Sequence, residues 1–103
     1  MSAGRGEPLD LDSIRRQRVD ILHLTKRYGA SNVRVFGSVA RGDARPGSDL
    51  DLLVEFDADR SLLDLIGLEL DLRDLLGSQV DVATVASLKE RIRPRVLAEA
   101  VPL

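Results

Sequence analysis

The sequence predicts an α+β fold, in which a small three-stranded mixed β-sheet packs its helices on one face. The length of 103 residues fits one small domain. Apolar residues make up 44% of the chain and aromatic residues only 3%, so the core must be aliphatic. Apolar residues recur at helical spacing in some segments and alternate with polar residues in others. In chain order, these segments predict a helix, two strands, a helix, a strand and a final helix.

The first expected helix follows a short polar N-terminus. We expect residues 1–9 to be flexible and residues 10–103 to form the domain, because Gly and Pro are frequent in the first segment. The helix begins near Asp10 or Asp12, since either carboxylate can accept from the free amides of a first turn. Gly29 can close it in the left-handed conformation, which glycine adopts at low cost.

The two later helices also carry end signals. Ser61 is a capping residue, and leucines at helical spacing follow it as far as Leu76. Gly77 then ends this helix. Residues 87–99 are expected to form the last helix, in which Pro94 marks a kink or a restart because its ring cannot fit inside a regular helix.

Three short strands are expected between the helices. They are Val33–Phe36, Leu50–Phe56 and Gln79–Ala83. The second strand alternates clearly, because side chains point to opposite faces at successive residues. One face carries Leu50, Leu52, Val54 and Phe56, and the other carries Asp49, Asp51, Leu53 and Glu55. The apolar face should pack on the helices, and the acidic face must meet water or a ligand because unpaired carboxylates are costly to bury.

Composition excludes several classes of site. The chain has no cysteine, so disulfides and thiolate metal sites are excluded, and its single histidine, His23, argues against zinc. Oxygen ligands remain, which favour Mg²⁺, Mn²⁺ or Ca²⁺. A net charge of −2 argues against direct nucleic-acid binding. No apolar run is long enough to span a membrane and no signal-peptide core is present, so we expect a cytoplasmic protein.

A Gly-Ser pair directly follows the first expected strand. Gly37 would let the backbone approach a bulky anion, and the amides of the next turn, together with the Ser38 hydroxyl, could bind phosphate. The alternative interpretation is an ordinary tight turn. A Walker loop and a dinucleotide-binding loop are both excluded, because the chain lacks their glycine and lysine patterns.

Three aspartates are candidate metal ligands. Asp49 and Asp51 project from one face of a strand and lie close enough to share a cation, unless they form only a solvated edge. Asp81 would join them if the second and third strands are neighbours, unless it marks a fraying strand end. Three such carboxylates suit a two-metal site. An EF-hand starting at Asp49 is excluded, because Val54 and Arg60 occupy the positions of its glycine and glutamate.

Taken together, these segments resemble a known family signature. Gly37 to Gly42 (GSVARG) followed by Ser48 to Val54 (SDLDLLV) looks like the signature of the DNA polymerase β-like nucleotidyltransferase superfamily. The chain length and Gln79 to Val82 (QVDV) resemble its minimal nucleotidyltransferase (MNT) branch. The resemblance covers residues 10–100 and implies the nucleotidyltransferase fold.

The resemblance also implies a cofactor, a substrate and residue roles. It implies Mg²⁺, with two ions, and a nucleoside triphosphate, most often ATP. Asp49 and Asp51 would hold both metals, while Asp81 would serve the metal on the nucleophile side and help to deprotonate the acceptor. The implied nucleotide-binding residues are Gly37, Ser38, Arg41 and Ser48. Arg41 is expected either to meet phosphate or to brace its loop through Asp43 or Asp49.

Members of the MNT branch commonly pair with a helical HEPN-type ribonuclease as toxin–antitoxin systems. The resemblance therefore implies an antitoxin that transfers AMP from ATP to a tyrosine hydroxyl of its toxin, within a hetero-oligomer. Two other functions remain open. The chain could neutralise its partner by contact alone, through apolar residues outside the main stripe of the second helix. It could also transfer a nucleotide to RNA or to a small molecule, although so short a chain has no separate acceptor-binding domain.

Overall fold

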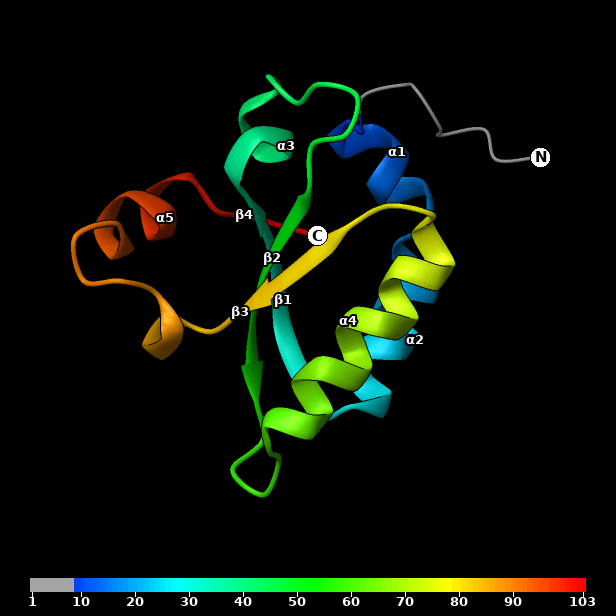
Figure 1. Cartoon of the computed structure of the whole chain (residues 1–103), viewed down its shortest axis with the longest axis vertical. Coiled ribbons are helices and arrows are strands. Elements are labelled where there is room, and N and C mark those ends of the chain that lie inside the picture. The colour runs from blue at the N-terminus through cyan, green and yellow to red at the C-terminus, as the bar shows by residue number, and fades with distance from the viewer. Residues whose placement is uncertain (1–8) are drawn as a thin grey trace.

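The computed structural model describes residues 9–103, so the predicted flexibility of residues 1–8 lies outside the described residues. The elements are α1 (Leu11–Arg16), α2 (Arg18–Arg27), β1 (Ala30–Phe36), α3 (Gly37–Arg41), β2 (Leu50–Phe56), α4 (Leu62–Leu76), β3 (Val80–Ala83), the 3₁₀ helix η1 (Val85–Ser87), α5 (Arg93–Glu99) and β4 (Val101–Pro102). Figure 1 shows the sheet in the middle of the molecule, with α2 and α4 on one side of it and α5 on the other. No helix within this part of the chain is long and apolar enough to cross a membrane.

The sheet is mixed, as predicted, and has the strand order β3-β2-β1-β4. β2 and β3 run parallel, whereas β1 pairs antiparallel with both β2 and β4. The sheet has four strands where three were expected. The additional strand, β4, is only two residues long and one of them is Pro102, so it shows no alternation that could have predicted it. The amide of Leu103 extends this edge by donating to the Val33 carbonyl at 3.1 Å.

The predicted alternation of β2 is confirmed by its burial. Leu50, Leu52 and Val54 are fully buried and belong to the main core, against which residues of α1, α2 and α4 pack. Complete burial of one such side chain stabilises the fold by about 1.5–3 kcal/mol. Leu53 points the other way and forms a second, smaller core with Val96 of α5. The helices therefore pack mainly on one face, while η1 and α5 cover part of the acidic face.

Local end signals placed most boundaries correctly. Asp10 caps α1 and accepts from the Ser13 amide at 2.7 Å, which decides between the two candidate caps. Ser61 caps α4 in a reciprocal capping box with Asp64, and Gly77 ends it at φ +66°.

Two helical predictions need correction. The first predicted helix is interrupted at Gln17, whose backbone leaves the helical region (φ −101°, ψ 15°) and separates α1 from α2. The last helix begins at Arg93 instead of residue 87, with Pro94 in its first turn. There the missing proline N–H costs nothing, because first-turn amides have no partner within the helix. Pro94 is therefore a restart.

Candidate functional site

The acidic face places Asp51 opposite Asp81 and brings Asp49 within hydrogen-bonding reach of Asp81. Parallel pairing of β2 with β3 places Asp51 directly opposite Asp81. Asp49 lies one residue before β2, next to Leu50, whose amide donates to the Gln79 carbonyl at 2.9 Å. The prediction that the second and third strands are neighbours is confirmed, and Asp81 therefore sits inside a paired strand and not at a frayed end.

The electrostatics of these acids reflect their crowding. Partial burial, and then the negative charges of Asp81 and Asp49, raise the pKa of Asp51 to about 6. Burial, followed by repulsion from and hydrogen bonding to Asp49, raises the pKa of Asp81. Like charges on one small surface disfavour ionisation, so a cation at this surface would reduce the repulsion between the carboxylates.

The carboxylates suit a hard cation whose remaining ligands would come from a bound substrate. The acids offer only oxygen ligands, which suit Mg²⁺. Among residues 9–103, however, no three His, Cys, Asp or Glu side chains converge into a ready metal cluster. Mg²⁺ is usually held by one or two carboxylates together with phosphate oxygens of a nucleotide, so a preformed three-ligand cluster is not required for it.

Gly37 lies directly against the acids. It follows Phe36, which pairs with Asp51 across the sheet, and it adopts φ +75°. A Cβ at this position would overlap the Asp51 carboxylate and would lie 3.2 Å from its Cγ. Glycine is therefore required twice, for the backbone conformation and for the space that Asp51 occupies. The turn continues into α3, where Ser38 is partly buried.

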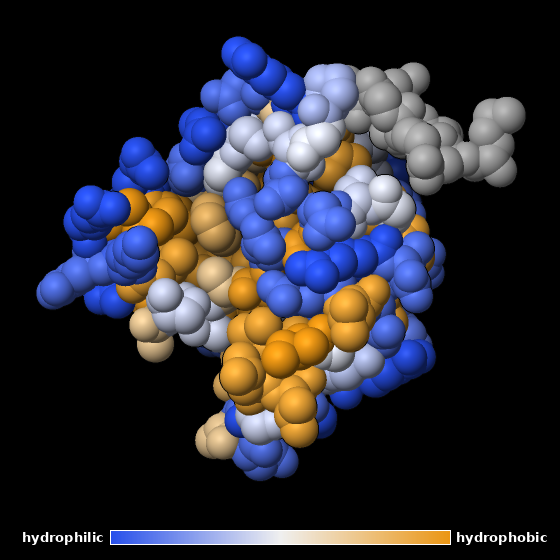
Figure 2. Space-filling view, in the orientation of Figure 1, coloured by the Kyte–Doolittle hydropathy of each residue, from blue (hydrophilic) through white to orange (hydrophobic). Residues whose placement is uncertain are grey.

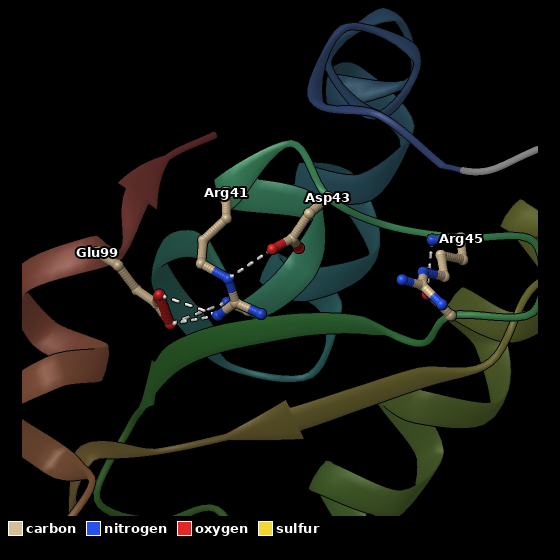
Figure 3. A network of polar contacts seen from close by, with 6 residues as sticks. Arg41, Asp43, Arg45 and Glu99 are labelled. Atoms are coloured by element: carbon tan, nitrogen blue, oxygen red, sulfur yellow. Dashed lines mark hydrogen bonds and ion pairs between the residues drawn. The ribbon is translucent and has the colours of Figure 1, made fainter.

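Arg41, at the end of α3, lies between two carboxylates (Figure 3). Its Nε donates to Asp43 Oδ2 at 3.3 Å, and its Nη1 donates to Glu99 Oε2 at 3.1 Å. These hydrogen bonds, with Glu99 first and Asp43 second, raise the pKa of Arg41. Of the two expected bracing partners, Asp43 is present and the second carboxylate is Glu99 instead of Asp49. Glu99 was missed because it lies 58 residues further along the chain, on a helix with no motif.

Glu99 also contacts Gly37 itself. The Gly37 amide donates to Glu99 Oε1 at 3.3 Å, so one carboxylate bridges the turn and the motif arginine. Ser48 is engaged within its own loop, where its hydroxyl accepts from the Arg45 amide and its amide donates to the Arg45 carbonyl, both at 2.9 Å. The role of Ser48 in nucleotide binding stays a prediction.

His23 lies away from the acids. It is exposed on α2, beside a hollow between α2 and α4 that is also lined by Asp20, Leu24 and Leu75. The α2 and α4 helices cover the apolar face of the sheet, opposite Asp51 and Asp81. His23 is thus a surface residue that lies on the other side of the sheet from the candidate aspartates.

Comparison with known proteins gives this arrangement a family. The nucleotidyltransferase domain model matches residues 21–103, which include β1 to β4 and all the candidate site residues. The chain belongs to the nucleotidyltransferase family. A Methanocaldococcus jannaschii relative assigned as a protein adenylyltransferase is 39% identical over 93 residues, covering 90% of this chain and 97% of the relative. The protein adenylyltransferase MntA of Thermococcus cleftensis is 46% identical over 78 residues, covering 76% of this chain and 79% of MntA.

Solved structures agree with the family at the level of the fold. A structure assigned as a minimal nucleotidyltransferase is 52% identical, with a TM-score of 0.82, and covers 95% of this nucleotidyltransferase chain and 100% of its own. A toxin–antitoxin structure with AMP-PNP has a TM-score of 0.70 at 21% identity, covering 82% of this chain and 69% of its own. At that identity the likeness concerns the fold alone. Both comparisons confirm the predicted MNT-type nucleotidyltransferase fold.

Proposed function

We propose that the chain is a magnesium-dependent protein adenylyltransferase that transfers AMP from ATP to a tyrosine hydroxyl of a HEPN-type ribonuclease toxin, and thereby neutralises it. The observation that carries the proposal is the placement of Asp51 opposite Asp81, with the bare backbone of Gly37 against the Asp51 carboxylate. The relative MntA is named a protein adenylyltransferase, and a fold neighbour is the MntA-HepT toxin–antitoxin complex. These names support a protein acceptor.

The proposed roles follow from position. Asp49 and Asp51 would hold Mg²⁺, and Gly37 and Ser38 would receive the triphosphate at the end of β1. The remaining proposed nucleotide contacts are Arg41 and Ser48. Bound Mg²⁺ supplies positive charge where negative charge develops on the phosphates. ATP is the proposed nucleotide and a hetero-oligomer with the toxin the proposed assembly.

The proposed reaction is an in-line substitution at the α-phosphorus. The tyrosine oxygen forms a bond to this phosphorus as the bond to the bridging oxygen of the β-phosphate breaks, and pyrophosphate leaves. The phenolic proton passes to Asp81, which is exposed on the same face and whose pKa is raised by burial and by Asp49.

Mass spectrometry tests this proposal directly. The purified protein is incubated with the toxin encoded beside it, ATP and Mg²⁺, and the intact mass of the toxin is measured. We expect the toxin to gain one or more AMP units, and the modified residue to be a tyrosine. Asp51→Asn should abolish the gain, because it removes one ligand charge without changing side-chain size. An unmodified toxin in a complex shown to form would contradict the proposal.

A second function, neutralisation by contact alone, is favoured by one surface. Four apolar side chains of α4 face solvent, namely Leu62, Leu63, Ile66 and Leu70, with Leu63 78% exposed. Figure 2 shows an apolar patch over the first turns of this helix. Patches of this kind often mark protein contacts.

The double variant Asp49→Asn, Asp51→Asn separates the two functions. The variant should be unable to catalyse the transfer. Cell survival in the presence of the toxin then measures neutralisation by contact alone, provided that the variant still forms the complex. Catalytic neutralisation predicts that protection is lost in this variant. Protection that persists would favour contact alone.

A further inference from the structure

Glu99 occupies the groups that are proposed to receive the triphosphate. Its Oε1 accepts from the Gly37 amide at 3.3 Å, and its two oxygens accept from Arg41 Nη1 at 3.4 and 3.1 Å. The Glu99 side chain is only 17% exposed and its contact with the Gly37 amide is partly buried, whereas Arg41 is 46% exposed. Figure 3 shows the Glu99 carboxylate reaching from α5 to the Arg41 guanidinium.

A carboxylate in this position presents the same chemistry as a phosphate oxygen. Both are anionic acceptors for a backbone amide and for a guanidinium, which forms its strongest hydrogen bonds with such partners. Arg41 is already shared between Glu99 and Asp43. A triphosphate can gain these donors only by replacing a carboxylate that already holds them.

The charge of Glu99 also opposes an incoming anion. Its charge contributes to the raised pKa of Asp51, after burial, Asp81 and Asp49, while Arg41 acts in the opposite direction. The surface that would receive a triphosphate therefore holds a fourth acid, and movement of that acid away from Gly37 would lower the repulsion.

We propose that Glu99 is a positioning residue that holds the Gly37 amide and Arg41 in the nucleotide-free protein, and that ATP binds by displacing its carboxylate from both. The inference rests on the proposed function, because it takes Gly37 and Arg41 as triphosphate contacts. The inference adds that the Glu99 carboxylate competes with the nucleotide for these groups and so sets the affinity for ATP. Glu99 lies outside the glycine-serine and aspartate motifs.

The displacement couples nucleotide binding to the C-terminal edge of the sheet. Glu99 is the last residue of α5, and Val101 of β4 pairs with Val35 of β1 two residues later. Release of the Glu99 carboxylate removes the polar link between α5 and α3. Binding of ATP should therefore loosen α5 and β4, and by linkage any contact that holds Glu99 away from Gly37 should strengthen ATP binding.

The test compares ATP affinity with stability in matched variants. Calorimetric titration of ATP in the presence of Mg²⁺, without an acceptor, is performed on the wild-type protein, Glu99→Gln and Glu99→Ala. Glu99→Gln keeps the shape and an acceptor for Gly37 while removing the charge, so it guards against a folding defect in Glu99→Ala. Glu55→Gln is the control. Glu55 lies on the acidic face of β2 and carries the same charge as Glu99, but its carboxylate accepts from Asn32 and not from Gly37 or Arg41.

We expect the Glu99 variants to bind ATP more tightly than the wild-type protein but to be slightly less stable. If the Glu99-bound arrangement holds about nine-tenths of nucleotide-free molecules, its removal lowers the dissociation constant for ATP about tenfold. The thermal midpoint should fall slightly in the same variants, because hydrogen bonds are lost. Glu55→Gln should leave the dissociation constant within about twofold of wild type, since only screened long-range charge is removed. A purely structural Glu99 would lower stability and affinity together.

The outcomes distinguish this inference from the proposed function. Tighter ATP binding by Glu99→Gln than by the wild-type protein supports the inference. ATP binding by wild type with equal or weaker binding by a folded Glu99→Gln overturns the inference and leaves the proposed function intact. Absence of ATP binding by wild type and by every folded variant overturns both.

Discussion

Replacement of Gly37 by alanine should damage the site in a way that the same substitution at Gly77 does not. Both glycines adopt positive φ, +75° at Gly37 and +66° at Gly77. A Cβ at Gly77 would meet no atom within 4 Å, whereas a Cβ at Gly37 would overlap the Asp51 carboxylate. Gly77→Ala is therefore a matched control that carries the backbone strain without the steric conflict.

The magnitude follows from two separate terms. A left-handed conformation costs an L-residue about 1–2 kcal/mol, and both variants should lose this much stability. At Gly37 the overlap adds the cost of overpacking, about 1–3 kcal/mol. Asp51 lies in β2 between β1 and β3, so its backbone cannot retreat and its carboxylate must rotate away. We expect Gly37→Ala to lose about 2–5 kcal/mol of unfolding free energy in total, and Gly77→Ala about 1–2 kcal/mol.

Two assays together test this reasoning. Urea unfolding followed by far-UV circular dichroism gives the free energy of unfolding, since the chain has no tryptophan to report its folding. Titration of ATP with Mg²⁺ gives the affinity of the site. Gly37→Ala should bind ATP at least about tenfold more weakly, because a rotated Asp51 loses its place in the donor set. Equal losses of stability and affinity in the two variants would refute the proposed contact between Gly37 and Asp51.

Two further predictions concern the helical layer and the acids. Gly67→Ala should destabilise the wild-type protein by about 1 kcal/mol despite the better helix propensity of alanine, because its Cβ would lie 2.7 Å from Tyr28 Cε1. In a Tyr28→Ala background the same substitution should stabilise the protein by up to about 1 kcal/mol. A double-mutant cycle measured by urea unfolding tests this, and an effect of Gly67→Ala with the same sign in both backgrounds would contradict the prediction. The folded pKa of Asp51, about 6, is raised above its unfolded value of 3.8, so its contribution to stability is full below pH 4 and is lost as pH rises through 6. Metal-free protein should therefore lose on the order of 1–2 kcal/mol between pH 4 and 7, after allowance for solvent screening at this partly buried group, and Asp51→Asn should flatten the curve. An unchanged slope in Asp51→Asn would assign the pH dependence to another group.

Segments with strong local patterns were predicted correctly. The bounds of β2 match the alternation that begins at Leu50, and the bounds of α4 match the capping serine before it and the glycine after it. Segments without such patterns were not. The break at Gln17 lies within an amphipathic stretch that reads as one helix, and the strand at Val101–Pro102 forms only because β1 offers it an edge. Short elements depend on their neighbours in space for hydrogen bonds, so their own residues carry little signal.

The candidate site divides in the same way. Strand periodicity predicted that Asp49 and Asp51 share a face, and the neighbouring position of Asp81 was predicted only on the condition that its strand lies beside β2. The register then placed Asp81 opposite Asp51. The roles of these residues in binding metal and nucleotide stay predictions. Glu99 had no sequence signal, because its importance comes from the packing of α5 against the face that carries the acids.

The sequence by itself determined the chemistry available to this protein. It has no cysteine and one histidine, so its candidate metal ligands are carboxylates, and a Gly-Ser pair directly follows the first strand. These properties depend on residue type and on neighbours within a few positions. Only the tertiary structure decided that Asp51 meets Asp81, that burial and the neighbouring carboxylates raise both pKa values, and that Glu99 holds Arg41 and Gly37. Those relations join residues 30 or more positions apart, and they arise from strand register and helix packing, which the burial of the aliphatic core selects.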